Sequence, residues 1–291
     1  RLAWPCLSLI VPCTTTRHCT KLLWMLQTLT ARRLLTPQGM LDHPIITVED
    51  GLICSIDSAS SSREETTLTP TFLDVHTHGA ANHDVMEGTP EALAAISRFL
   101  ATRGVGRYLA TTVTAPIDKT LRSLEGIADA IESPVHGAAV PIGIHLEGPF
   151  ISHAKRGVHP PADILPPDLA LFDRFQQAAR GHVCLMTIAP EIPGALDLIA
   201  HAAKQGVKLS IGHTNATAPE AEAAIAAGAT SATHTFNAMR PIDHRDPGVL
   251  ATVLDDDRLF AELICDGVHV APELVRLWFK AQGPDRAILV T

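Results

Sequence analysis

The stretch Thr71-Phe-Leu-Asp-Val-His-Thr-His-Gly79 decides how the rest of the chain is interpreted. Apolar and β-favouring residues lead into His76 and His78, and Gly79 ends the run. Because side chains alternate across a strand, His76 and His78 are predicted to point to the same face. Two imidazoles at the end of one strand supply half of a metal site. A His-X-His pair also arises by chance, so the rest of the chain must provide the other half.

Downstream of this stretch, apolar strand patterns alternate with helical patterns. The predicted strands are Phe72–His76, Tyr108–Val113, Ile142–Leu146, Val183–Ile188, Lys208–Gly212, Ser231–Thr235, Phe260–Cys265 and Ala287–Val290. The predicted helices are Pro90–Thr102, Ile117–Ile131, Pro167–Ala179, Ala195–Gln205, Pro219–Ala227 and Pro272–Ala281. Such repeats indicate a parallel sheet covered by helices. The strands favour an α/β fold of the (β/α)8 TIM-barrel type, incomplete at strand eight, over an open doubly wound sheet.

Upstream, the pattern changes to short strands. The segment 25–70 is predicted to be part of a small N-terminal β-domain, and Glu49-Asp-Gly51 between two β-branched runs indicates a hairpin. The barrel then spans residues 71–291, where we expect it to be truncated. Residues 1–24 are interpreted as a non-native or poorly ordered extension, an interpretation preferred over a targeting segment.

Composition narrows the class of function. The chain has 291 residues, 46% of them apolar, and a net charge of −8, which argues against a nucleic-acid partner. No apolar run reaches the roughly 18–20 residues needed to cross a bilayer, so no membrane partner is expected. The six cysteines lack C-x-x-C spacing. We therefore expect Cys184 and Cys265 to be reduced core residues of a cytoplasmic protein.

Polar residues with metal-binding chemistry follow several of the predicted strands, where barrel enzymes place their chemistry. Glu147 follows the third strand, and a buried Glu there is costly unless it is paired or bound to metal. His213 and His234 follow the fifth and sixth strands. Each His alone is compatible with a satisfied core residue, but together with Glu147 they form a set suited to zinc with an open position. His145 either shares this face or points deeper into the barrel.

Three loop positions allow two interpretations each. His159 lies in a Gly- and Pro-rich loop after the third strand, and His269 lies in the loop after the seventh. Each is either a ligand-binding residue or a loop His without a task. Arg245, in the loop after the sixth strand, either grips a phosphate or lies in a solvated loop.

These motifs together resemble a known family over residues 25–291. The motifs are Asp74-Val-His-Thr-His-Gly79, His145-Leu-Glu-Gly-Pro-Phe150, Lys155-Arg-Gly-Val-His-Pro160, Gly212-His-Thr-Asn-Ala216, Thr233-His-Thr-Phe-Asn-Ala-Met-Arg-Pro241 and Asp266-Gly-Val-His269. The chain resembles the N-acetylglucosamine-6-phosphate deacetylase family of the amidohydrolase superfamily. The resemblance implies hydrolysis of N-acetylglucosamine 6-phosphate to glucosamine 6-phosphate and acetate by a metal-activated water.

The resemblance also implies roles for individual residues. Glu147, His213 and His234 would hold the principal divalent metal, most often zinc. His76 and His78 match a pair that binds a second metal in some members, so one or two metals are expected. His159 would contact the acetyl carbonyl. The residues implied to bind the sugar phosphate are Asn237, Ala238, His269 and Arg245, the last across a homodimer interface.

One expected residue falls outside the sequence. The resemblance places a general-base Asp directly after Leu289-Val-Thr291, where the chain ends. We therefore expect this chain as it stands to release little or no acetate. Two alternatives remain: a metal-dependent amidohydrolase acting on a related amino sugar or a cyclic amide, and an inactive fragment that binds a sugar phosphate.

Overall fold

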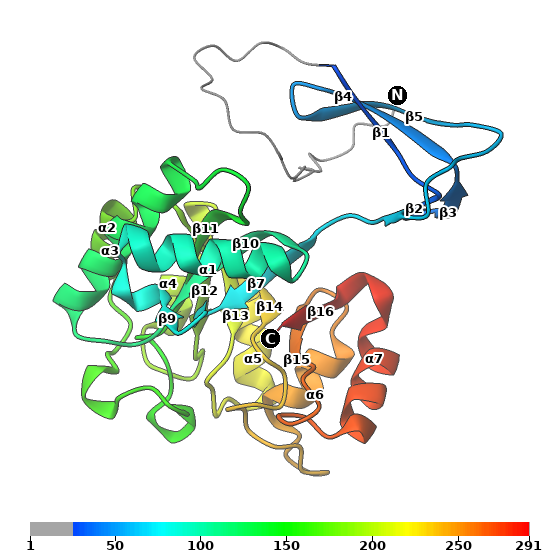
Figure 1. Ribbon diagram of the computed structural model, residues 1–291. Helices are drawn as coiled ribbons and strands as arrows, with labels where there is room; N and C mark the ends of the chain where they lie inside the picture. Colours follow the sequence, from blue (N-terminus) through cyan, green and yellow to red (C-terminus); the bar gives the residue numbers. More distant parts are fainter. Residues whose placement is uncertain (1–25, 291) are drawn as a thin grey trace.

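The structure, a computed structural model, describes residues 26–290, which contain two small three-stranded sheets, one large eight-stranded sheet and a short two-stranded sheet. The interpretation of residues 1–24 as an extension falls outside this range. The small sheets contain β1 (Gln27–Thr30), β2 (Arg33–Thr36), β3 (Gly39–Asp42), β4 (Pro44–Glu49), β5 (Leu52–Ser58) and β6 (Thr67–Leu68). They lie to one side of the large sheet, at the upper right of Figure 1.

The small sheets share a core of their own. Their strand orders are β1-β4-β5 and β3-β2-β6. Leu34, Ile46 and Val48 are buried together between them. The predicted hairpin is present, because β4 and β5 pair antiparallel and Asp50 and Gly51 between them have positive φ angles of 55° and 75°. This part of the chain therefore forms a small β-domain.

The large sheet is a barrel of eight parallel strands. Its strands are β7 (Phe72–Thr77), β10 (Val105–Thr112), β11 (Val140–Glu147), β12 (Val183–Ile188), β13 (Lys208–Ile211), β14 (Ala229–Ala232), β15 (Phe260–Ile264) and β16 (Ala287–Val290). Each strand is hydrogen-bonded to the next in chain order, from β7 to β16. Strand eight, β16, pairs with β15 in parallel register and lies against β7, so the barrel is nearly closed.

One helix connects each pair of successive barrel strands and covers the outside of the barrel (Figure 1). The helices are α1 (Pro90–Thr102), α2 (Ile117–Glu132), α3 (Leu169–Ala178), α4 (Ala195–Lys204), α5 (Ala218–Ala227), α6 (Gly248–Asp255) and α7 (Pro272–Arg286). Thr89 accepts a hydrogen bond from the Ala92 amide at the start of α1, and Pro90 takes the first helical position. The short strands β8 (Gly79–Ala80) and β9 (His83–Asp84) form a small hairpin after β7.

Several element bounds differ by a few residues from the predicted ranges. Two larger differences concern a helix and a cysteine. Helix α6 is absent from the predicted helices because Val249, Leu250 and Val253 are all buried, which leaves little amphipathic contrast. The expectation that Cys265 is a core residue is wrong: Cys265 is exposed because β15 ends at Ile264 and Cys265 begins a loop. Cys184 is partly buried.

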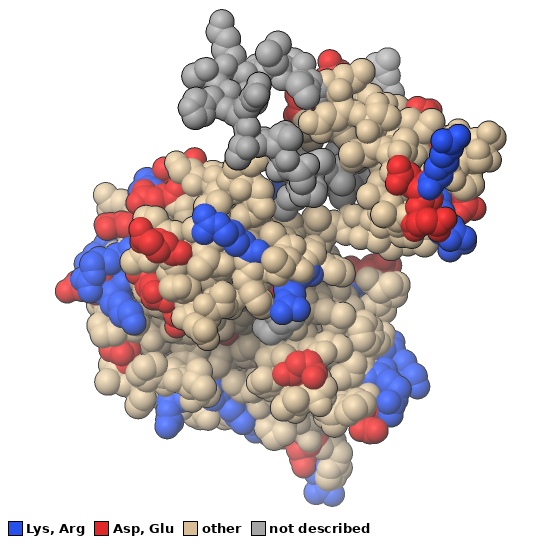
Figure 2. All heavy atoms as spheres, viewed as in Figure 1, with Lys and Arg blue, Asp and Glu red and all other residues tan. Residues whose placement is uncertain are grey.

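The outer surface carries mixed charge. Lys, Arg, Asp and Glu side chains are interspersed over the face drawn in Figure 2. Among residues 26–290, no helix combines the length and the apolar character needed to cross a membrane.

Candidate metal centre

Glu147 stands at the centre of a cluster of imidazoles at the C-terminal end of the barrel. It is the last residue of β11 and is only 2% exposed. His76 lies in β7, while His213 and His234 follow β13 and β14 by two residues each. All three His are buried. The parallel strands end at one rim of the barrel, so residues far apart in the sequence meet there.

The first group in the cluster consists of Glu147, His213 and His234. The His234 Nε2 lies 3.1 Å from Glu147 Oε1 and 3.1 Å from His213 Nε2. His213 Nε2 lies 3.3 Å from the same Glu147 oxygen. Their backbones are held in unusual conformations, with positive φ angles of 46° at His213 and 29° at His234. These conformations turn both rings toward one carboxylate oxygen.

The contacts of the Nδ1 atoms of His213 and His234 indicate which ring nitrogen carries the proton. His213 Nδ1 contacts the Lys155 carbonyl oxygen at 2.9 Å, and His234 Nδ1 contacts the Asn237 carbonyl oxygen at 3.1 Å. A carbonyl oxygen can only accept, so each Nδ1 donates and each Nε2 of the neutral ring carries a lone pair. The two Nε2 atoms therefore face each other, and a carboxylate oxygen, as acceptors.

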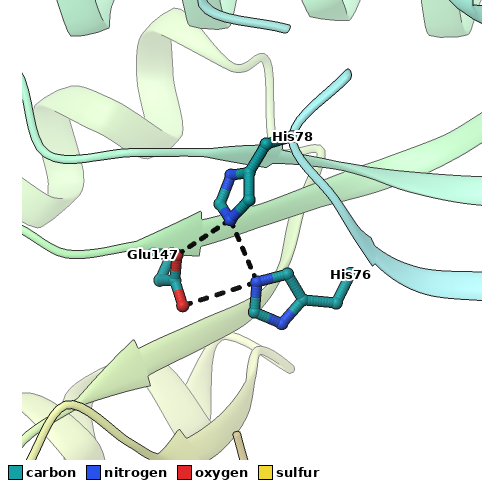
Figure 3. Close-up of side chains that lie close together, drawn as sticks. All are labelled: His76, His78 and Glu147. Atoms are coloured by element: carbon teal, nitrogen blue, oxygen red, sulfur yellow. Dashed lines mark hydrogen bonds and ion pairs between the residues drawn. The ribbon is translucent and has the colours of Figure 1, made fainter. Parts of the chain in front are cut away.

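His76 and His78 form a second group with the same carboxylate, as Figure 3 shows. The two Nε2 atoms lie 3.2 Å apart. His78 Nε2 lies 3.1 Å from Glu147 Oε2, and His76 Nε2 lies 3.4 Å from Glu147 Oε1. His78 Nδ1 contacts the Thr111 carbonyl oxygen at 3.2 Å, so it donates as well.

These donor sets fit divalent metal ions. Groups of acceptors that face one another in a buried site are unfavourable unless a cation or a proton lies between them. Imidazole nitrogen and carboxylate oxygen are ordinary zinc ligands, and three protein ligands leave an open position. Glu147 belongs to both groups, so it can bridge two adjacent ions.

In the metal-free protein, burial and neighbouring charges shift the pKa values of the residues in the centre. Burial alone would raise the pKa of the Glu147 carboxyl, but the surrounding imidazoles, chiefly His76, hold that pKa well below its usual range. Burial lowers the pKa of His76, yet Glu147 and Glu262 outweigh it and bring that pKa to about 10. His76 is therefore protonated near neutral pH in the metal-free protein.

His159 has the opposite tautomer from His78, His213 and His234. The Thr114 amide donates to His159 Nδ1 at 3.2 Å, and the Thr114 hydroxyl lies 2.8 Å from the same nitrogen. Nδ1 is thus the acceptor, and Nε2 carries the proton. Burial lowers the pKa of His159, which favours the neutral ring. His159 Nε2 lies 3.5 Å from Glu147 Oε2, so a hydrogen-bond donor stands beside the candidate metal ligands.

The residues expected to bind a sugar phosphate lie on loops after β14 and β15. The Asn237 side-chain nitrogen is buried and has no hydrogen-bond partner among the described residues. The Ala238 carbonyl oxygen accepts from the Thr214 amide. Arg245 and His269 are exposed. His269 Nδ1 contacts Asp266 at 2.7 Å. Hydrogen bonds from the His269 and Val268 amides are the main cause that lowers the pKa of Asp266 to about 2.

Three residues near the centre were unassigned or left open by the sequence. His145 lies fully buried inside the barrel, 2.7 Å from the Thr187 hydroxyl, and burial is the main reason that its pKa is lowered. Thr114 sets the His159 tautomer. Glu262 in β15 is 1% exposed and lies 2.8 Å from His76 Nδ1. A carboxylate inside the apolar strand Phe260–Ile264 is a signal for such a role, because a buried charge needs a partner.

Comparisons with known proteins agree with this geometry. The amidohydrolase family profile matches residues 67–282. The N-acetylgalactosamine-6-phosphate deacetylase of Escherichia coli O157:H7 is 36% identical over 270 residues, covering 92% of this chain and 71% of that protein. The N-acetylglucosamine-6-phosphate deacetylase of Bacillus subtilis is 35% identical over 270 residues, covering 89% of this chain and 68% of that protein.

A solved structure is similar over most of the chain. It is a mutant N-acetyl-D-glucosamine-6-phosphate deacetylase from Mycobacterium smegmatis in complex with N-acetyl-D-glucosamine-6-phosphate. The similarity has a TM-score of 0.84 at 35% identity and covers 91% of this chain and 70% of that chain. The family profile, the relatives and the parallel barrel lead to the same conclusion. This chain belongs to the amidohydrolase family.

Proposed function

We propose that the centre binds divalent metal, with zinc as the preferred ion. Glu147, His213 and His234 hold the first ion, and His76 and His78 hold a second that shares Glu147. The observation that carries this proposal is the direction of the hydrogen bonds. His213 and His234 each use Nδ1 to donate to a backbone carbonyl, which leaves two Nε2 lone pairs 3.1 Å apart. A metal ion satisfies both lone pairs and the carboxylate together.

Metal affinity at the His76 position is expected to rise with pH. Because the pKa of His76 is raised to about 10, its ring is protonated at neutral pH, and a metal ion must displace that proton. One proton leaves for each ion bound, so the affinity should increase by roughly tenfold per pH unit near neutrality. Zinc titrations at several pH values and constant ionic strength measure this slope. An affinity that stays constant or falls as the pH rises would contradict the expectation.

We propose further that the protein removes the acetyl group from N-acetylglucosamine 6-phosphate, giving glucosamine 6-phosphate and acetate. A bound metal supplies Lewis-acid chemistry and a nucleophile at neutral pH. The Nε2–H group of His159 would donate to the carbonyl oxygen of the N-acetyl group as negative charge develops on it. This role is supported by the His159 tautomer, which Thr114 holds from the other side.

The phosphate of the substrate is proposed to lie against the loops after β14 and β15. Asn237 offers a buried side-chain N–H group that has no other partner among residues 26–290. Ala238 and His269 would complete the contact from this chain. Arg245 would reach the phosphate from a second copy in a homodimer, which its exposed position allows. We place the protein in the cytoplasm, where sugar phosphates are metabolised.

A deacetylase for N-acetylgalactosamine 6-phosphate is the second candidate. The Escherichia coli relative that carries that name is 36% identical to this chain, and the Bacillus subtilis relative named for the glucosamine compound is 35% identical. The two sugars differ only in the orientation of one hydroxyl group. The metal centre and the proposed phosphate contacts serve both sugars equally well, so activity must decide between them.

Acetate release distinguishes these substrates. The assay uses a chain that continues past Thr291, where the resemblance places the proton-transferring Asp. We expect kcat/KM to be highest for N-acetylglucosamine 6-phosphate. Free N-acetylglucosamine should be at least about 100-fold poorer, because each hydrogen bond lost to a charged group costs about 1.5–3 kcal/mol. Faster release from the galactosamine compound would select the second candidate, and equal release from the free sugar would contradict the phosphate contacts.

A further inference from the structure

Glu262 is a buried carboxylate that contacts the metal centre through the His76 ring. It lies in β15 between Ala261 and Leu263, both fully buried, and is itself 1% exposed. Its Oε2 lies 2.8 Å from His76 Nδ1. The same oxygen accepts a long hydrogen bond of 3.4 Å from the His234 amide. A carboxylate buried among apolar residues raises the free energy of the folded protein unless hydrogen-bond or ion-pair partners compensate it, and His76 and the His234 amide are such partners.

The hydrogen bond from His76 to Glu262 sets the direction of the His76 ring. A carboxylate accepts, so Nδ1 of His76 must donate to it. Nε2 then points at Glu147 and His78 with the geometry of a ligand. We propose that Glu262 is a positioning residue that makes His76 a metal ligand, and that it thereby decides whether the second metal position is filled.

His76 differs from the other candidate ligands in how it is held. The rings of His78, His213 and His234 donate from Nδ1 to backbone carbonyl oxygens, those of Thr111, Lys155 and Asn237. No side-chain substitution removes a backbone carbonyl. The orientation of His76 depends instead on one side chain, that of Glu262. A change at position 262 can therefore weaken the second metal position while the first keeps its ligands.

The negative charges near His76 support the same role for Glu262. Two divalent ions side by side repel each other, and Glu147 is the carboxylate that both positions share. Glu262 adds a second negative charge on the His76 side, directly behind the ligand ring. This charge makes His76 a stronger ligand and offsets part of the repulsion between the ions.

The inference rests on the proposed metal centre and is independent of the proposed substrate, so the test measures metal binding alone. Zinc is titrated into the metal-free chain in competition with a chromophoric chelator, and cobalt spectra report the ligand set. The wild-type chain should bind two equivalents. Glu262→Gln should keep the first equivalent at wild-type affinity and bind the second about 10- to 100-fold more weakly, the usual cost of losing an outer partner of a ligand.

The matched control is Glu132→Gln on the surface. Glu132 accepts from an imidazole too, His182 Nε2 at 3.1 Å, so the same substitution breaks a similar pair away from the centre. This variant should bind both equivalents as the wild type does. In a His76→Asn background, Glu262→Gln should have no further effect on metal binding, because Glu262 acts through His76.

Several results would overturn the inference. They are a second equivalent bound at wild-type affinity by Glu262→Gln, additive effects of the two substitutions, and a wild-type chain that binds only one equivalent at saturating zinc. If Glu262→Gln does not fold, Glu262→Asp takes its place. Asp keeps the negative charge, but its side chain is one methylene shorter. The second equivalent should therefore bind more weakly than in the wild type, but by a smaller factor than in Glu262→Gln. Failure of the deacetylase proposal would appear in acetate release and would leave these titrations unchanged.

Discussion

Replacing Glu147 with Gln is expected to weaken metal binding strongly at both positions. Glu147 belongs to both metal-binding groups, and its two oxygens lie 3.1 Å from His234 Nε2 and 3.1 Å from His78 Nε2. The amide of Gln presents an N–H group where one carboxylate oxygen stood, and it carries no charge. Zinc affinity should therefore fall by at least about 100-fold, the upper end of the loss caused by removing an outer partner.

Zinc and cobalt titrations of the purified metal-free chain measure this loss. Glu132→Gln again serves as the control, since it removes a surface carboxylate that pairs with His182 and should leave both equivalents in place. A Glu147→Gln variant that keeps one tight equivalent would mean that the imidazoles bind metal without the carboxylate. That outcome would contradict the shared role of Glu147.

Replacing Gly148 with Ala is expected to lower the free energy of unfolding by about 2–4 kcal/mol. Gly148 has a φ angle of 77°, which strains any L residue. A Cβ atom there would also lie 2.1 Å from the Thr114 hydroxyl oxygen. The strain costs about 1 kcal/mol or more, and the displacement of Thr114 adds about 1–3 kcal/mol. Thr114 would in addition lose its hold on the His159 tautomer.

Thermal unfolding of the metal-free chain measures this change, which corresponds to a fall in Tm of roughly 4–12 °C. Gly137→Ala is the matched control. Gly137 has a φ angle of 73°, but a Cβ atom there would meet nothing within 4 Å. The control therefore carries the backbone strain without the collision. If the free energy of unfolding falls by the same amount in both variants, the contact between position 148 and Thr114 does not contribute to the loss of stability.

Much of this architecture follows from patterns that the sequence shows directly. Strand β12 is buried along most of its length and reads as an apolar run, and the predicted ranges Val183–Ile188 and Ala287–Val290 coincide with β12 and β16. Helix α1 spans Pro90–Thr102, the range predicted from the sequence. The spacing of His76 and His78 placed both rings on one face, and they meet at Glu147. Local periodicity and strand order are sufficient for these inferences.

Other features depend on contacts between distant segments, and no local pattern specifies them. Helix α6 is buried on most sides, so it lacks the periodic polar face that indicates a helix. The proton positions on His213 and His234 follow from the carbonyl groups of Lys155 and Asn237. The partner of Glu262 becomes visible only once β15 and β7 lie in one barrel.

The imidazoles around Glu147 are proposed to be metal ligands. The most direct measurement is X-ray diffraction at the zinc absorption edge, from crystals of this chain grown with zinc. We expect an anomalous peak among Glu147, His213 and His234, and a second peak between His76 and His78. Zinc bound only at other sites, or an empty centre at saturating zinc, would contradict this proposal.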